Sequence, residues 1–188
     1  MRKAVWLLGI LVLVTGILGC SSNLDKGPAL KFMQGVQDGD KNKMYEAANL
    51  TPKIVNDSRE KLIHPMQYKQ TDEQRKDSEH ALRISGEIDF FSTKLKKLLP
   101  KSASFQIAKT KSKSSTGNTT NAIHFVKITY GKKEEAISDK MGRPVKEMVV
   151  HLQQATRAIQ GRSIHEFSFN SEDFDKLADR DFEVLSYF

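Results

Sequence analysis

Apolar residues recur every three or four positions through the first half of the chain, which is the spacing that buries one face of an α-helix. The longest such stripe ends before Pro100 and comprises Ala81, Ile84, Ile88, Phe91, Leu95 and Leu98. It predicts a long helix that packs one face on a core and ends at the proline. A coiled coil would need the pattern over three or four heptads, which this stripe scarcely reaches, so we favour a helix within one globular domain.

Three shorter helices are predicted before the long one, because their boundaries carry capping residues. Pro28 suits the first turn of a helix, and Gly39 suits the position just after its end. Asp40 can then cap a second short helix. Thr51, which precedes a proline, can cap a third helix that stops near His64.

Beyond Pro100 the hydrophobic period changes from 3.6 to two, which is typical of β-strands. We expect strands from Phe105 to Lys113 and over residues 122–130, 145–159, 163–169 and 182–188. A short helix is expected over Phe174 and Leu177, between the last two strands. Helices followed by a run of antiparallel strands predict an α+β fold.

The order of these elements resembles the NTF2-like and cystatin-like superfamily. The resemblance depends on the first helical segment, GPALKFMQGVQDGDKNKMYEAA (27–48), with its internal break, and on the C-terminal run of strands. It implies that the N-terminal helices pack on a curved antiparallel β-sheet to form a cone whose mouth can hold a ligand or an active site. Residues 145–159 and 163–169 would then form much of the concave wall.

The first twenty residues have the composition of an export signal. Arg2 and Lys3 precede an uncharged, apolar stretch from Ala4 to Gly19, and Cys20 follows at once. A basic start, an apolar run and a small residue before a cleavage site are typical of a secretory signal peptide. The run is shorter than the ~20 residues that a membrane-spanning helix needs, so we favour removal over retention.

The run Ile17-Leu18-Gly19-Cys20 resembles the lipobox of bacterial lipoprotein signal peptides, although Leu18 is larger than the residue usual at its position. This resemblance implies that a lipid is attached to the Cys20 sulfur as a thioether, that acyl chains such as palmitate anchor the protein, and that cleavage occurs just before the cysteine. Ser21 is compatible with transfer to the outer membrane. We therefore expect a lipoprotein of the cell envelope, facing the periplasm if the cell is Gram-negative.

Cleavage would give a signal peptide at residues 1–19, a lipidated cysteine and short tether at 20–27, and a single α+β domain at 28–188. The signal holds two of the 30 basic residues and none of the 23 acidic residues, which leaves the rest of the chain with a net charge of +5. In an exported protein this balance suits anionic lipid or cell-wall polymer, and nucleic acid is not expected as a partner. Cys20 is the only cysteine, so the chain has no internal disulfide.

His151 and His165 are the candidate catalytic residues. They fall on neighbouring predicted strands and could face each other, with Asp89 or Glu147 supplying a carboxylate for acid–base chemistry. Histidines half-buried in a sheet without a catalytic role are the competing interpretation. We favour this second interpretation and therefore expect a protein that is not an enzyme.

The sequence implies no metal and no cofactor. No two of the five histidines have the H-x-x-x-H spacing of a helical zinc site. The run DGDKN at 38–42 lacks the glycine and the final acid of a calcium loop, so it is better explained as a helix end followed by a helix cap. Phosphate-binding loops, dinucleotide fingerprints and the G-x-S-x-G motif are also absent from the sequence.

Lys109, Lys111 and Lys113 are candidate anion-binding residues. They alternate along a predicted strand and would share one face of it. With the lysines at the end of the long helix they could form a basic corner for anionic lipid headgroups or peptidoglycan. Lysines also protect the edges of sheets and complement helix C-termini, which explains them without a ligand.

Three functions are therefore open. We favour a membrane-anchored, non-catalytic domain that binds a partner protein or a small ligand. The alternatives are a hydrolase-like or isomerase-like pocket enzyme using His151 or His165, and an assembly factor that binds the cell wall or anionic lipid through its lysines.

Overall fold

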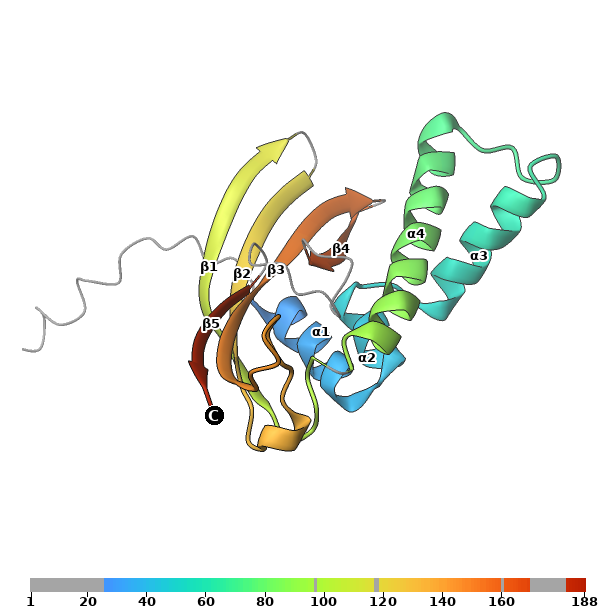
Figure 1. Cartoon of the computed structure of the whole chain (residues 1–188). Helices are drawn as coiled ribbons and strands as arrows, with labels where there is room; N and C mark the ends of the chain where they lie inside the picture. The colour runs from blue at the N-terminus through green and yellow to red at the C-terminus, as the bar shows by residue number, and fades with distance from the viewer. Residues whose placement is uncertain (1–25, 97, 117–118, 160, 170–181) are drawn as a thin grey trace, which may run out of the picture.

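The structure is a computed structural model that describes residues 26–96, 98–116, 119–159, 161–169 and 182–188. Helices come first in the described chain and strands follow (Figure 1). The helices are α1 (Gly27–Asp38), α2 (Lys41–Ala47), α3 (Pro52–Ile63) and α4 (Asp72–Lys94). The strands are β1 (Ser104–Thr116), β2 (Thr119–Thr129), β3 (Val145–Ile159), β4 (Arg162–Phe169) and β5 (Phe182–Tyr187), with a short 3-10 turn at Lys133–Glu135.

The strands form one antiparallel sheet in the order β1-β2-β3-β4, and β5 also pairs with β3. β3 is long enough for two partners along one edge: Leu152–Ile159 pair with β4, and Val145–Val150 pair with β5. The sheet curves around α1 (Figure 1). The α+β class is confirmed, with N-terminal helices packed on a curved antiparallel sheet.

The predicted helix boundaries are confirmed by their caps. Gly39 ends α1 with a φ of 68°, a left-handed conformation that glycine adopts without strain. The Asp40 carboxylate accepts hydrogen bonds from the backbone N–H groups of Asn42 and Lys43 at the start of α2. The Thr51 hydroxyl oxygen accepts from a backbone N–H in the first turn of α3. Each of these bonds satisfies a donor that the helix itself leaves unpaired.

The long helix ends earlier than predicted. α4 stops at Lys94, because the N–H groups of Leu98 and Leu99 both bond back to the Leu95 carbonyl in a tight turn. The turn buries both Leu98 and Leu99. The Tyr130 hydroxyl then donates to the Leu98 carbonyl at 2.7 Å. The apolar stripe therefore identified the buried positions, but Pro100 does not mark the end of the helix.

The core lies between α1, the second half of α4 and one face of the sheet, which we call the inner face. Phe32 of α1 is fully buried and stacks on Phe167 of β4, with ring centroids 4.5 Å apart. Phe91 of α4 packs edge-on against the same Phe32 ring. Leu152 and Val126 are buried on the inner faces of β3 and β2. α1 thus fills the part of the concave face that we expected to hold a ligand.

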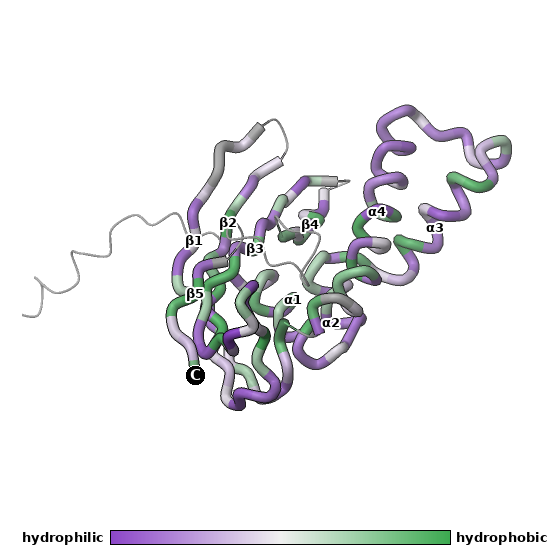
Figure 2. The backbone as a smooth tube through the Cα atoms, viewed as in Figure 1, coloured by the Kyte–Doolittle hydropathy of each residue, from purple (hydrophilic) through white to green (hydrophobic). Residues whose placement is uncertain are grey.

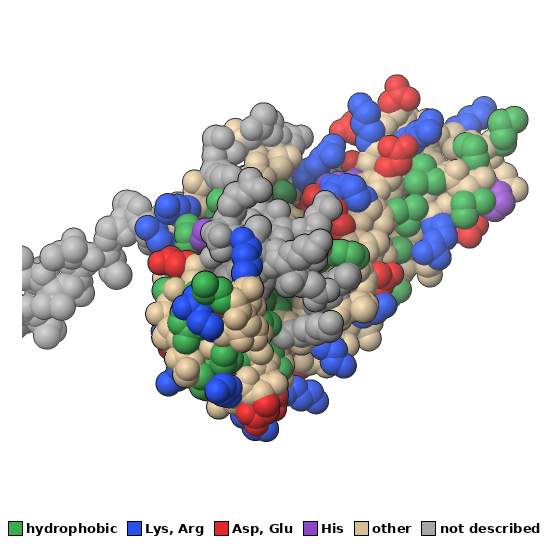
Figure 3. Space-filling view, in the orientation of Figure 1, with side chains coloured by type: hydrophobic (Ala, Val, Ile, Leu, Met, Phe, Trp, Pro, Cys, Tyr) green, Lys and Arg blue, Asp and Glu red, His purple; other side chains and the backbone are tan. Residues whose placement is uncertain are grey.

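α3 and the first half of α4 form a helical hairpin that projects away from the sheet and is largely hydrophilic (Figures 1 and 2). Charged side chains of both signs cover its visible face (Figure 3). Among the described residues, no helix is both long and apolar enough to cross a membrane. The predicted signal peptide, Cys20 and the short helix over Phe174 and Leu177 lie outside the described residues.

Candidate functional site

The structure separates the two candidate histidines. His151 pairs with Phe125 on the outer face of the sheet, where the two rings lie 4.5 Å apart. His165 pairs with Thr156 on the inner face, where the Thr156 hydroxyl lies 3.0 Å from Nδ1 of His165. Positions 151 and 156 of one strand point to opposite faces because side chains alternate. The prediction that these histidines face each other is therefore wrong.

The candidate carboxylates do not complete an acid–base pair either. Asp89 lies on α4 and pairs with Lys41, 2.9 Å away. Glu147 shares the outer face with His151, but its carboxylate bonds to Lys127 and Thr129 instead. The hydrogen bond from Lys127 lowers the pKa of Glu147, which makes this carboxyl a poorer base. His151 and His165 thus lie on separate faces of the sheet, and neither Asp89 nor Glu147 joins them in one site.

The candidate lysines form a row along one edge of the sheet. β1 is an edge strand, and Lys109, Lys111 and Lys113 occupy alternate positions on it, as predicted. Lys109 and Lys111 are exposed, and the Lys111 ammonium lies 5.2 Å from the Phe125 ring centroid. Lys113 lies nine positions beyond Ser104 along the strand, a distance of ~30 Å. The row therefore runs along the edge strand, and a basic corner shared with the lysines at the end of α4 stays a prediction.

A row of polar side chains crosses the inner face of the sheet, and sequence analysis missed it as a unit. The Thr110 hydroxyl of β1 donates to Nδ1 of His124 at 2.9 Å, and Nε2 of His124 donates to the Gln154 amide oxygen at 2.9 Å. The Gln154 amide nitrogen donates to Thr156, whose hydroxyl reaches His165. We call these five residues the inner polar row. The signal that identifies the inner polar row is a polar residue at a position where the alternation of the strand predicts a buried side chain.

The inner polar row fixes His124 in one neutral form. A carboxamide oxygen only accepts, so Nε2 of His124 must carry the proton, and Nδ1 accepts from Thr110. The His124 side chain has no exposed surface, and burial lowers its pKa below the ordinary 6.5, although the bond to Gln154 opposes this. Both nitrogens of His124 are occupied and its ring is fully buried, so His124 stabilises the sheet and offers no reactive atom.

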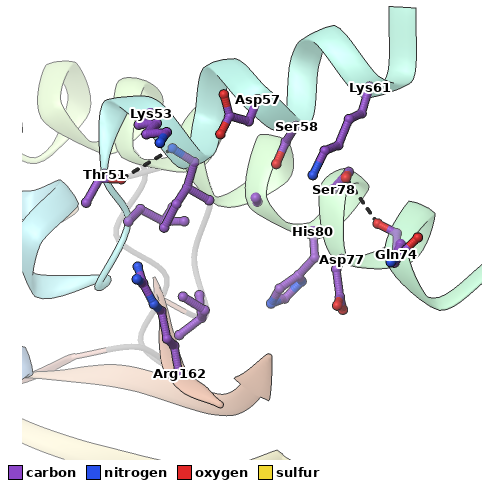
Figure 4. A pocket seen from close by; sticks show the side chains of 14 residues that line it. Thr51, Lys53, Asp57, Ser58, Lys61, Gln74, Asp77, Ser78, His80 and Arg162 are labelled. Atoms are coloured by element: carbon purple, nitrogen blue, oxygen red, sulfur yellow. Dashed lines mark hydrogen bonds between the residues drawn. The ribbon is translucent and has the colours of Figure 1, made fainter. Parts of the chain in front are cut away.

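A cleft of about 590 Å³ lies where the α3–α4 hairpin meets the start of β4 (Figure 4). This volume falls within the range of ~300–1,000 Å³ that is typical of small-molecule sites. Leu50, Ile54, Ala81 and Ile164 provide its apolar wall. Ser58 and Ser78 are small buried residues on the two helices, and they leave room between α3 and α4. The cleft therefore combines an apolar interior with polar walls.

Cationic side chains reach the cleft from two elements. Lys53 and Lys61 lie on α3, and Arg162 lies at the start of β4 on the opposite wall (Figure 4). Among the described residues, none of these three cations has a carboxylate within ion-pair distance. Of the two acids that line the cleft, Asp77 lies 3.9 Å from Arg157, whereas Asp57 shares the face of α3 with the lysines.

A cluster around Arg83 joins the hairpin to the sheet beside the cleft. Arg83 of α4 binds the Glu166 carboxylate of β4 through two hydrogen bonds of 2.6 and 2.7 Å. It also donates to Glu87 and to Nδ1 of His80. Bonding to Arg83 lowers the pKa of Glu166, and burial raises the pKa of Glu87. This cluster therefore links α4 to β4 through charged hydrogen bonds.

His80 is the imidazole that lines the cleft, but it cannot accept a proton readily. Arg83 only donates, so it occupies the lone pair of Nδ1, and Nε2 carries the proton 4.0 Å from Glu166. Burial and the nearby Arg83 lower the pKa of His80. The Ser78 hydroxyl already donates to the Gln74 carbonyl. The cleft therefore lacks a nucleophile activated by a base among the described residues.

Metal binding finds no support in the described part of the chain, where no three His, Cys, Asp or Glu side chains converge. Comparison of the sequence with protein-family models, and of the chain with characterised proteins and solved structures, finds no match. The site is therefore defined by the geometry of the cleft alone.

Proposed function

We propose that this chain is a lipoprotein of the bacterial cell envelope, anchored through a lipid on Cys20, whose α+β domain binds a small ligand in the cleft. The domain acts by binding and not by catalysis. The cleft carries the binding part of this proposal, because its volume is typical of a ligand site and apolar side chains line it beside convergent polar ones. The lipobox-like run before Cys20 supports the anchor. The likeness to NTF2-like and cystatin-like domains is part of the same proposal.

The anchor follows from simple energetics. One acyl chain holds a protein to a membrane only marginally, whereas two or more hold it stably. A thioether lipid on Cys20 would supply that number and would leave the sulfur without redox chemistry. A short polar segment would then place the first helix close to the membrane surface. The proposed location is the periplasmic face of the outer membrane if the cell is Gram-negative.

Fractionation of cells that express the full chain tests the anchor. Wild-type protein should sediment with membranes and become soluble only in detergent. Cys20→Ser should appear in the soluble fraction, or should keep its signal peptide and migrate as a larger species. Ser21→Ala is the matched control and should behave like wild type in membrane attachment. Normal cleavage and membrane attachment of Cys20→Ser would refute the lipid anchor.

A further inference from the structure

We infer that the ligand of the cleft is an amphipathic organic anion, with an apolar body and one carboxylate or phosphate group. This inference rests on the proposed binding function and specifies its ligand. The apolar body would lie on Leu50, Ile54 and Ile164, which line the inner part of the cleft. The anionic group would lie between α3 and Arg162.

The apolar contact surface comes from three different elements. Leu50 belongs to the connection between α2 and α3, Ile54 to the first turn of α3, and Ile164 to β4. Leu50 and Ile164 are almost fully buried, at 2 % and 5 % exposure, so they belong to the packed wall. The β4 edge is also held to this connection, because the His165 N–H donates to the Ala48 carbonyl at 3.0 Å. The apolar wall is therefore preformed.

The charge of the cleft favours an anion. Lys53 and Lys61 are eight residues apart on α3, so they lie on one face of the helix, ~12 Å apart along its axis. Arg162 enters from the opposite wall (Figure 4). Asp57, between the two lysines, offsets one of the three cations, and Asp77 is already compensated by Arg157. The remaining positive charge attracts an anion into the cleft and disfavours a cation of equal size.

An ammonium and a guanidinium on facing walls can contact one oxyanion together. Arginine presents parallel N–H donors that match a carboxylate or phosphate, and lysine adds a point charge. Water screens the attraction between these cations and the anion, because Lys53 and Arg162 are exposed. The apolar wall must therefore contribute to the affinity, and the cations must supply the selectivity for charge. A ligand with both parts follows from this division.

Three probes with the same alkyl chain separate these contributions: decanoate and decylammonium below their micelle concentrations, and decanol below its solubility limit. The protein is the chain from residue 20 with Cys20→Ser, which keeps every described helix and strand and carries no lipid to compete for the cleft. Calorimetric titration should show decanoate binding about tenfold more tightly than decylammonium, with decanol between them. Equal affinities for decanoate and decylammonium would overturn the inference.

Substitutions then locate the binding site. Arg162→Gln and Lys61→Gln should each weaken decanoate binding about two- to fivefold, and about tenfold together, with decanol unaffected. Lys109→Gln removes the same charge from the exposed edge of β1, outside the cleft, and should change neither affinity. Equal losses in Arg162→Gln and Lys109→Gln would show that net charge alone attracts the anion, which also overturns the inference.

The two proposals fail in different ways. If no probe binds, with any headgroup, the cleft is not a site for small amphiphiles, and the proposed binding function fails with the inference. If all three probes bind equally and Ser58→Phe blocks them all, the cleft is a ligand site but its ligand is not selected by charge. Only the inference fails in that case. Membrane fractionation of Cys20→Ser is independent of both results.

Discussion

His124 should make the stability of the folded domain depend on pH. Its imidazole is fully buried, is bonded through both nitrogens and has a pKa lowered by burial. The folded protein therefore keeps His124 neutral at a pH where the unfolded chain, with an ordinary pKa of 6.5, takes up a proton. Because the unfolded state then binds more protons, the free energy of unfolding must fall as the pH drops below about 6.5.

The magnitude follows from proton linkage. At one pH unit below its ordinary pKa, an unfolded histidine is about nine-tenths protonated. If the unfolded state binds one more proton than the folded state, the free energy of unfolding changes by about 1.4 kcal/mol for each pH unit. Lowering the pH from about 7.5 to about 5.5 should therefore remove roughly 1.4 kcal/mol through His124, if the folded imidazole stays neutral throughout. The pKa of His80 is also lowered, so His80 adds to the loss of stability at low pH. This added loss is the same in wild type and in a His124 variant.

Urea unfolding at the two pH values measures this contribution. His124→Gln cannot titrate but can still accept from Thr110 and donate to Gln154. Its loss of stability over the same pH range should therefore be smaller than that of wild type, by up to about 1.4 kcal/mol. Thr110→Val is the matched variant: it removes one bond to the imidazole, costs about 1–2 kcal/mol at neutral pH and keeps the pH dependence. An identical pH dependence in wild type and His124→Gln would refute a buried neutral His124.

Three further predictions concern packing and the Arg83 cluster. Gly35→Ala should lower the free energy of unfolding by about 1–3 kcal/mol, because the new Cβ would lie 2.7 Å from a methionine side chain of α2. Unchanged stability in urea would contradict this close approach. Gly86→Ala should raise stability by up to about 1 kcal/mol, because the site is an exposed helix position with open space, and a loss would mean that the glycine is needed. Arg83→Met should lower the free energy of unfolding by about 1–2 kcal/mol, because it leaves the half-buried Glu166 without its partner. Arg75→Met removes an exposed pair on the same helix and should lower it by less than about 0.5 kcal/mol. Equal losses of stability in the two arginine variants would show that the Arg83 cluster does not stabilise the contact between α4 and β4.

The fold could be predicted largely from local signals. Capping residues such as Asp40 and Thr51 act within one turn, so they mark helix starts without tertiary information. The β3 strand has the predicted bounds of 145–159, because its apolar alternation persists over its whole length. Pro100 was misleading, because α4 ends at Lys94 and is followed by a turn that buries Leu98 and Leu99 and accepts a hydrogen bond from Tyr130. Such burial depends on contacts with the sheet that no local pattern contains.

The candidate site could not be predicted in the same way. Whether His151 and His165 meet depends on the parity and register of strand pairing, and a difference of one residue reverses the face. The cleft joins residues of α3 and α4 to Arg162, which is roughly a hundred residues further along the chain. Lys53 and Lys61 carry no local signal of a site, because helix periodicity does not show what lies opposite a helix. Only the packing of the hairpin against β4 identifies the site.

Mapping of a bound probe by NMR tests the central proposal, that the cleft is the ligand site. Decanoate should be titrated into ¹⁵N-labelled protein that begins at residue 20 and carries Cys20→Ser. Amide shifts should change at Leu50, Ile54 and Ile164, and signals of the outer face near His151 should stay in place. Changes centred on the outer face or on the inner polar row, with none in the cleft, would contradict the proposal.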